Sequence, residues 1–371
     1  MLYVLYASAI ILNLFAIKYL YNNKVIIGFT IITILLLWTW NTQGPDIYNY
    51  WVQYRSVDAN SFATNGYQLF YNIIMNFFST NGYSFYTYRF VVSLVALLII
   101  VITISKMNAN LNIVMVMYML TQLFLDGVQI RNFFAVPFLV LGIYFIASKK
   151  KLWKIKYILS IACASLFHIG FVIYLVFLMI PSEDKETSKM IKTHAIIASI
   201  LCVFFFFGRK YVAVLISFMN SVDVNRASSY SIHSTNLGPL IVLALQIVGI
   251  AVTAYLHAKI NRISDLYSQS EYCDEFGRDK EFIKRLFWIN VVGLYIVPLS
   301  FVQLTFYRLV RNLLLINFAS FGIINKYYRK SSYIFLTAVV YLLIWQVAEF
   351  YILNTYTTII EPFFINSMLL E

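Results

Sequence analysis

The residues of this chain best suited to chemistry are arginines placed in or beside long apolar runs. Arg131 opens one such run, and Arg308 and Arg311 lie three residues apart in another. An ionised side chain costs about 3 kcal/mol or more in hydrocarbon, so an arginine kept there is a candidate functional residue. Its rigid fork binds phosphate or carboxylate through two hydrogen bonds. We therefore predict an anion site that contains these three arginines.

Each of these arginines also has an interpretation that needs no substrate. Arg131 would pair with Asp126 or with lipid headgroups, and Arg308 and Arg311 would extend toward the membrane surface. Two features favour the anion site. The start of a helix places free N–H groups beside Arg131. Arg308 and Arg311 share one helix face, where their charges repel unless an anion lies near.

Two further residues are candidates for proton transfer. His168 interrupts an apolar run and would be a general base, a donor to a sugar or phosphate oxygen, or a structural hydrogen-bond partner. Asp46 follows a Gly-Pro turn and would share a helix face with Tyr50 and Tyr54. Tyr48 and Tyr50 suit sugar rings, although aromatic residues also mark a membrane interface.

Arginine and lysine are distributed differently along the sequence. The lysines lie in short connections, and a cluster at 149–156 predicts a cytoplasmic turn. On that topology sixteen of seventeen lysines are cytoplasmic, while seven of eleven arginines lie at the outer side: 55, 89, 131, 209, 226, 308 and 311. Topology does not require arginine there, so we predict an acidic or phosphorylated substrate. Arg89, Arg226 and Asn132 join the predicted substrate-binding set. No nucleotide loop or metal-ligand spacing occurs, so we predict no cofactor and no metal.

Composition places these residues in a membrane protein. The chain has 371 residues, of which 61% are hydrophobic and 12% charged, with a mean hydropathy of +0.76. Soluble domains carry about 25% charged residues. The net charge of +12 does not indicate nucleic acid, because the lysines lie between apolar runs. The prediction is an all-α, polytopic transmembrane bundle of about ten to twelve spans.

The whole chain, 1–371, is predicted to form one transmembrane domain. Segments 41–83 and 208–237 would be extracytoplasmic loops, the first with amphipathic or re-entrant helices at the outer face, and 259–285 a cytoplasmic loop. Residues 157–180 form either one crossing or a broken pair with its bend at His168. The broken pair is preferred because it keeps the next lysines cytoplasmic, and protein must then cover the helix ends.

Several short patterns, taken in order, resemble the EpsG-like branch of Wzy-type polysaccharide polymerases. They are Asp46-x-Tyr48-x-Tyr50, Gly66-Tyr67 with Tyr71 and Asn72, Ile130-Arg131-Asn132 with Ala135, Phe167-His168, and Tyr307-Arg308. Asn132 stands where members commonly have Gln, and Asn65 where they often have Glu. These departures leave the identity of the acidic site residues open.

The resemblance implies a metal-independent bacterial inner-membrane glycosyltransferase, similar in plan to C-type glycosyltransferases. Its substrate would be an oligosaccharide repeat on undecaprenyl diphosphate, polymerised at the outer leaflet into O-antigen, capsule or exopolysaccharide. Membrane lipid and a chain-length regulator would be its partners. The arginines would hold the diphosphate, and His168 or Asp46 would activate the acceptor hydroxyl.

Two other functions fit the same residues. A flippase or exporter of lipid-linked glycans would also use outward arginines, but transporters usually show internal repeats and charges along a central path. A ligase or glycosyltransferase with a polyprenyl-phosphate donor is hard to separate by sequence. A membrane acyltransferase is disfavoured because His168 would face the outer side.

Overall fold

The chain is helical throughout its described parts. The computed structural model describes residues 1–20, 22–41, 46–56, 68–149, 151–181, 187–219, 237–267, 272–329, 331–349 and 359–365, with the backbone alone for 187 and 209–219. These residues contain no β-strand. The prediction of an all-α fold is confirmed.

Six helical segments in the described residues are long and apolar enough to cross a membrane. They are α1 (Leu2–Tyr19), α5 (Phe85–Lys106), α8 (Ile130–Ser148), the first part of α10 (Thr187–Met219), α12 (Gly238–Arg262), and the run through η4 (Leu304–Phe306), α16 (Tyr307–Arg311) and α17 (Leu314–Ile324). At about 1.5 Å per residue, such segments cover nearly the thickness of a bilayer core. The predicted polytopic bundle is therefore confirmed.

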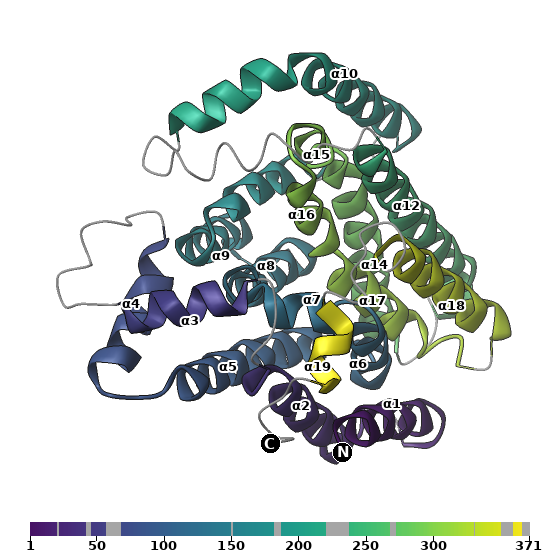
Figure 1. Ribbon diagram of the computed structural model, residues 1–371. Coiled ribbons are helices and arrows are strands. Elements are labelled where there is room, and N and C mark those ends of the chain that lie inside the picture. The colour runs from purple at the N-terminus through teal and green to yellow at the C-terminus, as the bar shows by residue number, and fades with distance from the viewer. Residues whose placement is uncertain are drawn as a thin grey trace.

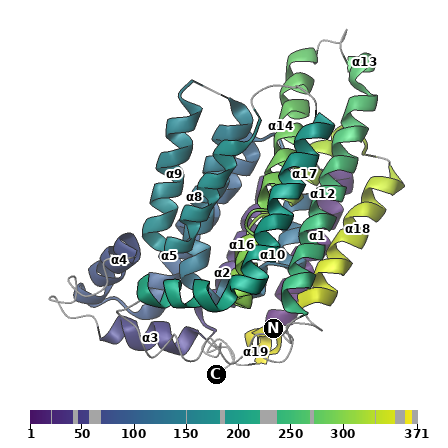
Figure 2. The ribbon, with the colours of Figure 1, turned by 90° about the horizontal axis from the view of Figure 1, so that it is seen from above.

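Shorter helices complete the bundle. They are α2 (Lys24–Thr39), α6 (Leu111–Leu120), α7 (Leu123–Val128), α9 (Trp153–Phe167), the 3₁₀ helix η3 (Ile169–Met179), α14 (Cys273–Gly293), α15 (Leu299–Val302) and α18 (Ser332–Val347). Four small helices lie at the ends: α3 (Ile47–Arg55), α4 (Leu69–Thr80), α13 (Ser264–Tyr267) and α19 (Glu361–Ile365). The long helices run side by side between two ends (Figures 1 and 2).

These two ends differ in the charged residues that they carry. We call the end with α3, α4 and α19 the arginine end, because Arg131 and Arg308 lie there. The opposite end, where α13 and the start of α14 project in Figure 2, is the lysine end and contains Lys149 and Lys326. Lys106 closes α5 at the lysine end, and Ser84 caps the same helix at the arginine end by accepting a hydrogen bond from the N–H of Thr87. The lysines named here therefore lie at one end of the bundle, and Arg131 and Arg308 lie at the other.

The two most buried spans are those that carry the arginines. In α8 the apolar window is 78% buried, and in residues 304–324 it is 89% buried, against 11% for the span in α10. Helix α8 packs against α9, α5 and α14, while α17 packs against α6, α12 and α14. Figure 1 shows α8 and α16 in the interior, with α10 and α1 at the margin. The helices that carry Arg131 and Arg308 are therefore packed on most sides by other helices.

Helices α3 and α4 form the predicted amphipathic layer at the arginine end. In α3 the buried residues are Ile47, Tyr50 and Tyr54, which share one face, while Tyr48 on the other face is 66% exposed. In α4 the side chain of Tyr71 is fully buried. The prediction of short amphipathic helices within 41–83 is confirmed for 46–56 and 68–80. The Gly66-Tyr67 part of the family pattern lies outside the described residues.

Residues 157–180 form the broken pair, with its bend at His168. Helix α9 ends at Phe167, His168 has an extended backbone, and η3 runs back against α9. At about 2.0 Å per residue, the 11 residues of η3 cover about the same distance as the 15 residues of α9 at about 1.5 Å. Since the two arms match in length, the hairpin returns the chain toward the lysine end.

Two predicted loops contain more helix than expected. The predicted loop 208–237 begins with α10, which continues to Met219 and bends so that its last part crosses the arginine end (Figure 2). The predicted loop 259–285 is helical where described, through the end of α12, α13 and the start of α14. In the second of these loops the local charges suit the helix ends. Lys259 and Arg262 lie in the last turn of α12, and Asp274 and Glu275 in the first turn of α14. Each pair favours its helix end.

Candidate functional site

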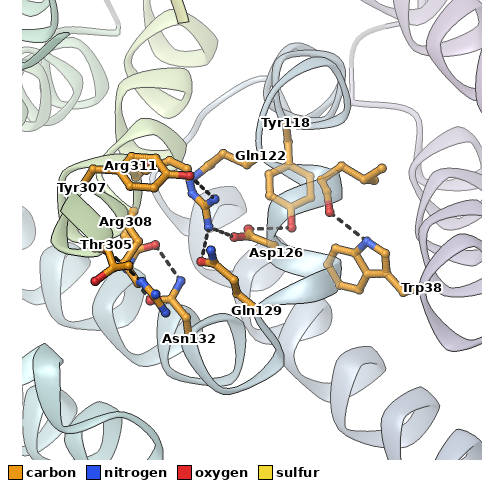
Figure 3. A network of polar contacts seen from close by, with 12 residues as sticks. Trp38, Tyr118, Gln122, Asp126, Gln129, Asn132, Thr305, Tyr307, Arg308 and Arg311 are labelled. Atoms are coloured by element: carbon orange, nitrogen blue, oxygen red, sulfur yellow. Dashed lines mark hydrogen bonds and ion pairs between the residues drawn. The ribbon is translucent and has the colours of Figure 1, made fainter. Parts of the chain in front are cut away.

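A buried ion pair lies at the centre of the arginine end. Nη2 of Arg311 is 3.0 Å from Oδ1 of Asp126, and the two side chains are 0% and 1% exposed. The same nitrogen donates to Oε1 of Gln129 at 3.0 Å, and the hydroxyl of Tyr118 donates to Asp126 at 3.0 Å (Figure 3). The charge of Glu349, buried after α18, also acts on Arg311. Because these charges are desolvated, each depends strongly on its partners.

Arg311 is therefore part of the interior rather than of an open surface. Arg311 as a substrate contact stays a prediction; its guanidinium faces Asp126 and Gln129. Of the two alternatives for Arg131 that need no substrate, pairing with Asp126 is wrong, because Asp126 pairs with Arg311 instead. We assign the Asp126–Arg311 pair to the architecture of the site: it ties α7 to α16 across 185 residues of sequence.

Helix α16, which carries Arg308, is short, and side chains of neighbouring helices bond to its carbonyl groups. Between α16 and α17 the N–H of Leu313 bonds to the carbonyl of Val310, so the carbonyl of Leu309 is left for another donor. The hydroxyl of Tyr174 in η3 donates to it at 2.7 Å. The carbonyl of Arg311 accepts from Nε2 of Gln122 at 2.8 Å. The break in the helix thus exposes carbonyls that neighbouring elements use as anchors.

Asn132 forms a second tie to the same helix break. Its amide exchanges two hydrogen bonds with the amide of Asn312, at 3.0 and 3.2 Å, and its side chain is 1% exposed. Asn132 was predicted to bind substrate, but both groups of its amide pair with Asn312. We assign it to the joining of α8, one residue after Arg131, to the end of α16.

Arg89 is also buried in the architecture. Its Nη1 donates to the carbonyl of Asn41 at 2.9 Å, and its Nη2 to the carbonyl of Gly127 at 2.5 Å. Gly127 has no space for a side chain, since a Cβ there would lie 2.5 Å from the ring of Trp38. Arg89 was predicted to contact substrate; in the structure it is 1% exposed and joins Gly127 of α7 to Asn41, just after α2.

Arg131 differs from these arginines because its partners are neutral. Its Nη1 donates to Oε1 of Gln68 at 2.8 Å, and its Nε to the hydroxyl of Tyr50 at 3.4 Å. Its guanidinium also lies over the rings of Tyr50 and Tyr71, at 5.1 and 5.9 Å. No ion pair joins it to a carboxylate within the described residues. Its side chain is oriented by α3 and α4, and its charge remains available to an anion.

Arg308 has a similar environment. Its Nε donates to the carbonyl of Thr305 at 2.9 Å, and its side chain is half-buried (Figure 3). No described carboxylate forms an ion pair with it, although the charge of Asp46 acts on it from a distance. Arg308 and Arg131 both act electrostatically on His168. Both arginines, one from α8 and one from α16, thus lie near enough to His168 for their charges to act on its ring.

His168 has one ring nitrogen already in use. The backbone N–H of Gly170 donates to its Nδ1 at 3.2 Å. A neutral imidazole that accepts at Nδ1 carries its proton on Nε2. Partial burial of His168 and the charges of Arg308 and Arg131 both disfavour a positive charge on its ring. The geometry therefore presents an N–H donor and favours the donor role over the general base.

Asp46 stands at the rim of the same region. It precedes α3, its carboxylate caps no N–H of that helix, and its charge acts on both Arg131 and Arg308. Tyr50 contacts Arg131 directly, whereas Tyr48 faces away from it and stacks on Trp51 at 6.0 Å. Of the two predicted sugar contacts, Tyr50 therefore lies at Arg131, whereas Tyr48 lies on the exposed face of α3. Arg226 lies outside the described residues.

Several residues of this site were not predicted from sequence. They are Gln68, Tyr118, Gln122, Gln129, Tyr174 and Asn312, and Asp126 was assigned to a different arginine. One signal was available: Tyr118, Gln122 and Asp126 recur at i, i+4 and i+8 in an apolar run, as expected of a polar stripe facing the interior. Their partners in α16 are remote in sequence, so the spacing alone could not pair them.

Fold and site together define a multi-pass membrane protein with a cationic centre at one end of its bundle. The model of the EpsG family matches residues 24–363, nearly the whole chain, and the protein therefore belongs to the EpsG family. The predicted resemblance is confirmed, and membership suggests a polysaccharide-polymerase type of function. No curated protein matches the sequence. No solved structure matches it.

Proposed function

We propose that this protein polymerises lipid-linked oligosaccharide repeats at the outer face of a bacterial cytoplasmic membrane. Family membership supports a polysaccharide polymerase. The observation that carries the proposal is the convergence of Arg131 and Arg308 on His168, without an ion-paired carboxylate in the described residues. Such arginines suit a diphosphate, because each fork can hold two phosphate oxygens.

The reaction transfers a glycan from undecaprenyl diphosphate to the non-reducing end of a second lipid-linked repeat. The acceptor oxygen forms a bond to the anomeric carbon, while the bond from that carbon to the diphosphate oxygen breaks. The proton of the acceptor hydroxyl passes to a carboxylate, and the diphosphate leaves with one additional negative charge. Arg131 and Arg308 stabilise that charge.

Asp46 and His168 have separate roles in this reaction. Asp46 takes the proton of the acceptor hydroxyl, since its carboxylate caps no helix N–H and lies near both arginines. His168 donates its Nε2–H to an oxygen of the leaving diphosphate, because Nδ1 is occupied by Gly170. We therefore propose Asp46, rather than His168, as the base. The lysine end would face the cytoplasm, as positive charge does in short loops.

Complementation of a deletion strain tests the proposal. We expect Arg131→Ala and Arg308→Ala to lower the yield of polymer by about a hundredfold or more, because each removes charge stabilisation at the leaving group. Single repeats should then accumulate at the outer leaflet, detected by gel electrophoresis and by surface labelling of glycan in intact cells.

Arg55→Ala is the matched control. Arg55 lies at the same end but is exposed and stacks on Trp51 at 4.7 Å, so its removal should leave the ladder unchanged. An unchanged polymer length in both site variants would overturn the diphosphate clamp. Repeats that accumulate inside the cell would instead indicate a flippase.

A further inference from the structure

Helix η3 presents one straight row of aromatic side chains to the core. Phe171, Tyr174 and Phe177 recur at every third residue, and each is 0% exposed. In a 3₁₀ helix, with about three residues per turn, such residues lie directly above one another, whereas in an α-helix the row would turn away. His168 stands at the start of this row and meets Phe171 at 5.9 Å between ring centroids. The row therefore begins beside His168 in the candidate site and continues along η3 into the interior of the bundle.

Tyr174 lies in the middle of the row and connects three elements. Its hydroxyl donates to the carbonyl of Leu309 in α16 at 2.7 Å. Its own carbonyl accepts a hydrogen bond from the hydroxyl of Tyr157 in α9. Its hydroxyl also interacts with the side chain of Asn312, the partner of Asn132. Among the described residues, no other side chain of α9, His168 or η3 forms a hydrogen bond with α16.

The bond to Leu309 acts close to both charged groups. Leu309 follows Arg308 directly, and Gly170 at the tip of η3 lies beside it, since a Cβ at Gly170 would be 3.8 Å from Cδ2 of Leu309. Gly170 is also the residue that bonds Nδ1 of His168. A shift of η3 along α16 would therefore move the His168 ring relative to the Arg308 guanidinium. The hydrogen bond from Tyr174 to Leu309 opposes such a shift.

We infer that Tyr174 is a positioning residue that sets His168 against Arg308 through the carbonyl of Leu309. The inference rests on the proposed function, in which these two groups act on the same diphosphate. Tyr174 itself is fully buried and does not touch substrate. Its effect is on geometry, and a displacement of about 1 Å in a catalytic group can lower a rate by about a hundredfold.

The test compares Tyr174→Phe with Tyr341→Phe in the purified full-length protein. Each substitution removes one buried hydroxyl; Tyr341 bonds Asn317 in a different part of the bundle. Spin labels at Ile169 and Thr305, both exposed, report the distance between the hairpin tip and the start of α16. We expect a broader distance distribution in Tyr174→Phe and no change in Tyr341→Phe. This readout needs no activity, so it is independent of the proposed reaction.

Synthesis of polymer from lipid-linked repeats gives the second readout. Tyr174→Phe should lower kcat by about tenfold or more while KM for the donor changes by less than about twofold, because the arginines still bind it. In a His168→Ala background the same substitution should have almost no further effect. An unchanged distance distribution, or effects that multiply, would overturn the inference. A broadened distribution in a protein whose wild type makes no polymer would overturn the proposed function alone.

Discussion

The two ends of the bundle use positive charge differently. At the lysine end, Lys326 is 2.9 Å from buried Asp279 and 2.6 Å from Glu275, and Arg285 is 2.8 Å from Glu281. At the arginine end, Arg131 and Arg308 are oriented by hydroxyl, amide and carbonyl oxygens, and no described carboxylate pairs with them. Paired charges are neutralised by the fold itself, whereas charges held by neutral groups stay available to an anion.

Arg311 shows that this difference is not simply one of location. It lies three residues after Arg308 and in the same helix, yet it pairs with Asp126 as the cations of the lysine end pair with their carboxylates. One short helix therefore carries one structural and one available arginine. The neighbouring helix α7 decides which arginine is paired, because its Asp126 reaches Arg311 and not Arg308.

Asp126→Ala should have the largest effect on stability. It would leave Arg311 buried without its paired carboxylate, at a cost of about 3–5 kcal/mol in the free energy of unfolding. Thermal unfolding of the protein in detergent measures this. Glu275→Ala provides the comparison from the lysine end: its side chain is 40% exposed and Lys326 keeps Asp279 as a partner, so the loss should be much smaller. Equal losses would contradict the distinction between the two kinds of pair.

Arg308→Lys should separate binding from stability. The lysine keeps the charge but loses the two-pronged contact with phosphate, so we expect a fall of about tenfold or more in polymer synthesis. The unfolding temperature should hardly change, since Arg308 has no ion pair to lose in the described residues. A radiolabelled-donor assay and a thermal scan of the same preparation give both values. Full activity would show that charge alone suffices.

Glu275→Gln should have the smallest effect and should depend on pH. Its hydrogen bond from Lys326 holds the pKa of Glu275 below the usual value of a glutamate. A lowered pKa in the folded state adds stability above the ordinary pKa, and this is lost as pH falls through the lowered one. Because the carboxylate is 40% exposed, the contribution should be below about 1 kcal/mol. Unfolding scans from neutral to acidic pH should show a smaller acid-induced loss in the variant.

Much of the helix pattern and one special feature of the site follow from local sequence. The apolar runs predict the spans, and the interruption at His168 predicts the bend, because a polar residue and Gly170 end the apolar helix there. The sequence analysis did not predict that η3 is a 3₁₀ helix, although Phe171, Tyr174 and Phe177 recur at every third residue, as a 3₁₀ helix requires. That spacing differs by only one part in six from an α-helical period, so over few residues it is easily overlooked.

The assignment of arginines was the weakest part of the sequence prediction. Arg89, Arg311 and Arg131 are all arginines at one end of apolar helices, and their local patterns do not distinguish them. Arg89 bonds backbone carbonyls, Arg311 bonds Asp126, and Arg131 bonds neutral side chains. Which partner each meets depends on chain segments that are 38 to 185 residues away.

The sequence by itself determined that this is a polytopic helical membrane protein with its lysines and arginines apart, because burial of apolar runs and the placement of charge are local requirements. It also determined the EpsG family pattern. Only the tertiary structure decided that Arg311 is neutralised while Arg131 and Arg308 are not. The reason is physical: a charge is satisfied by atoms within a few ångströms, and those atoms come from helices remote in sequence.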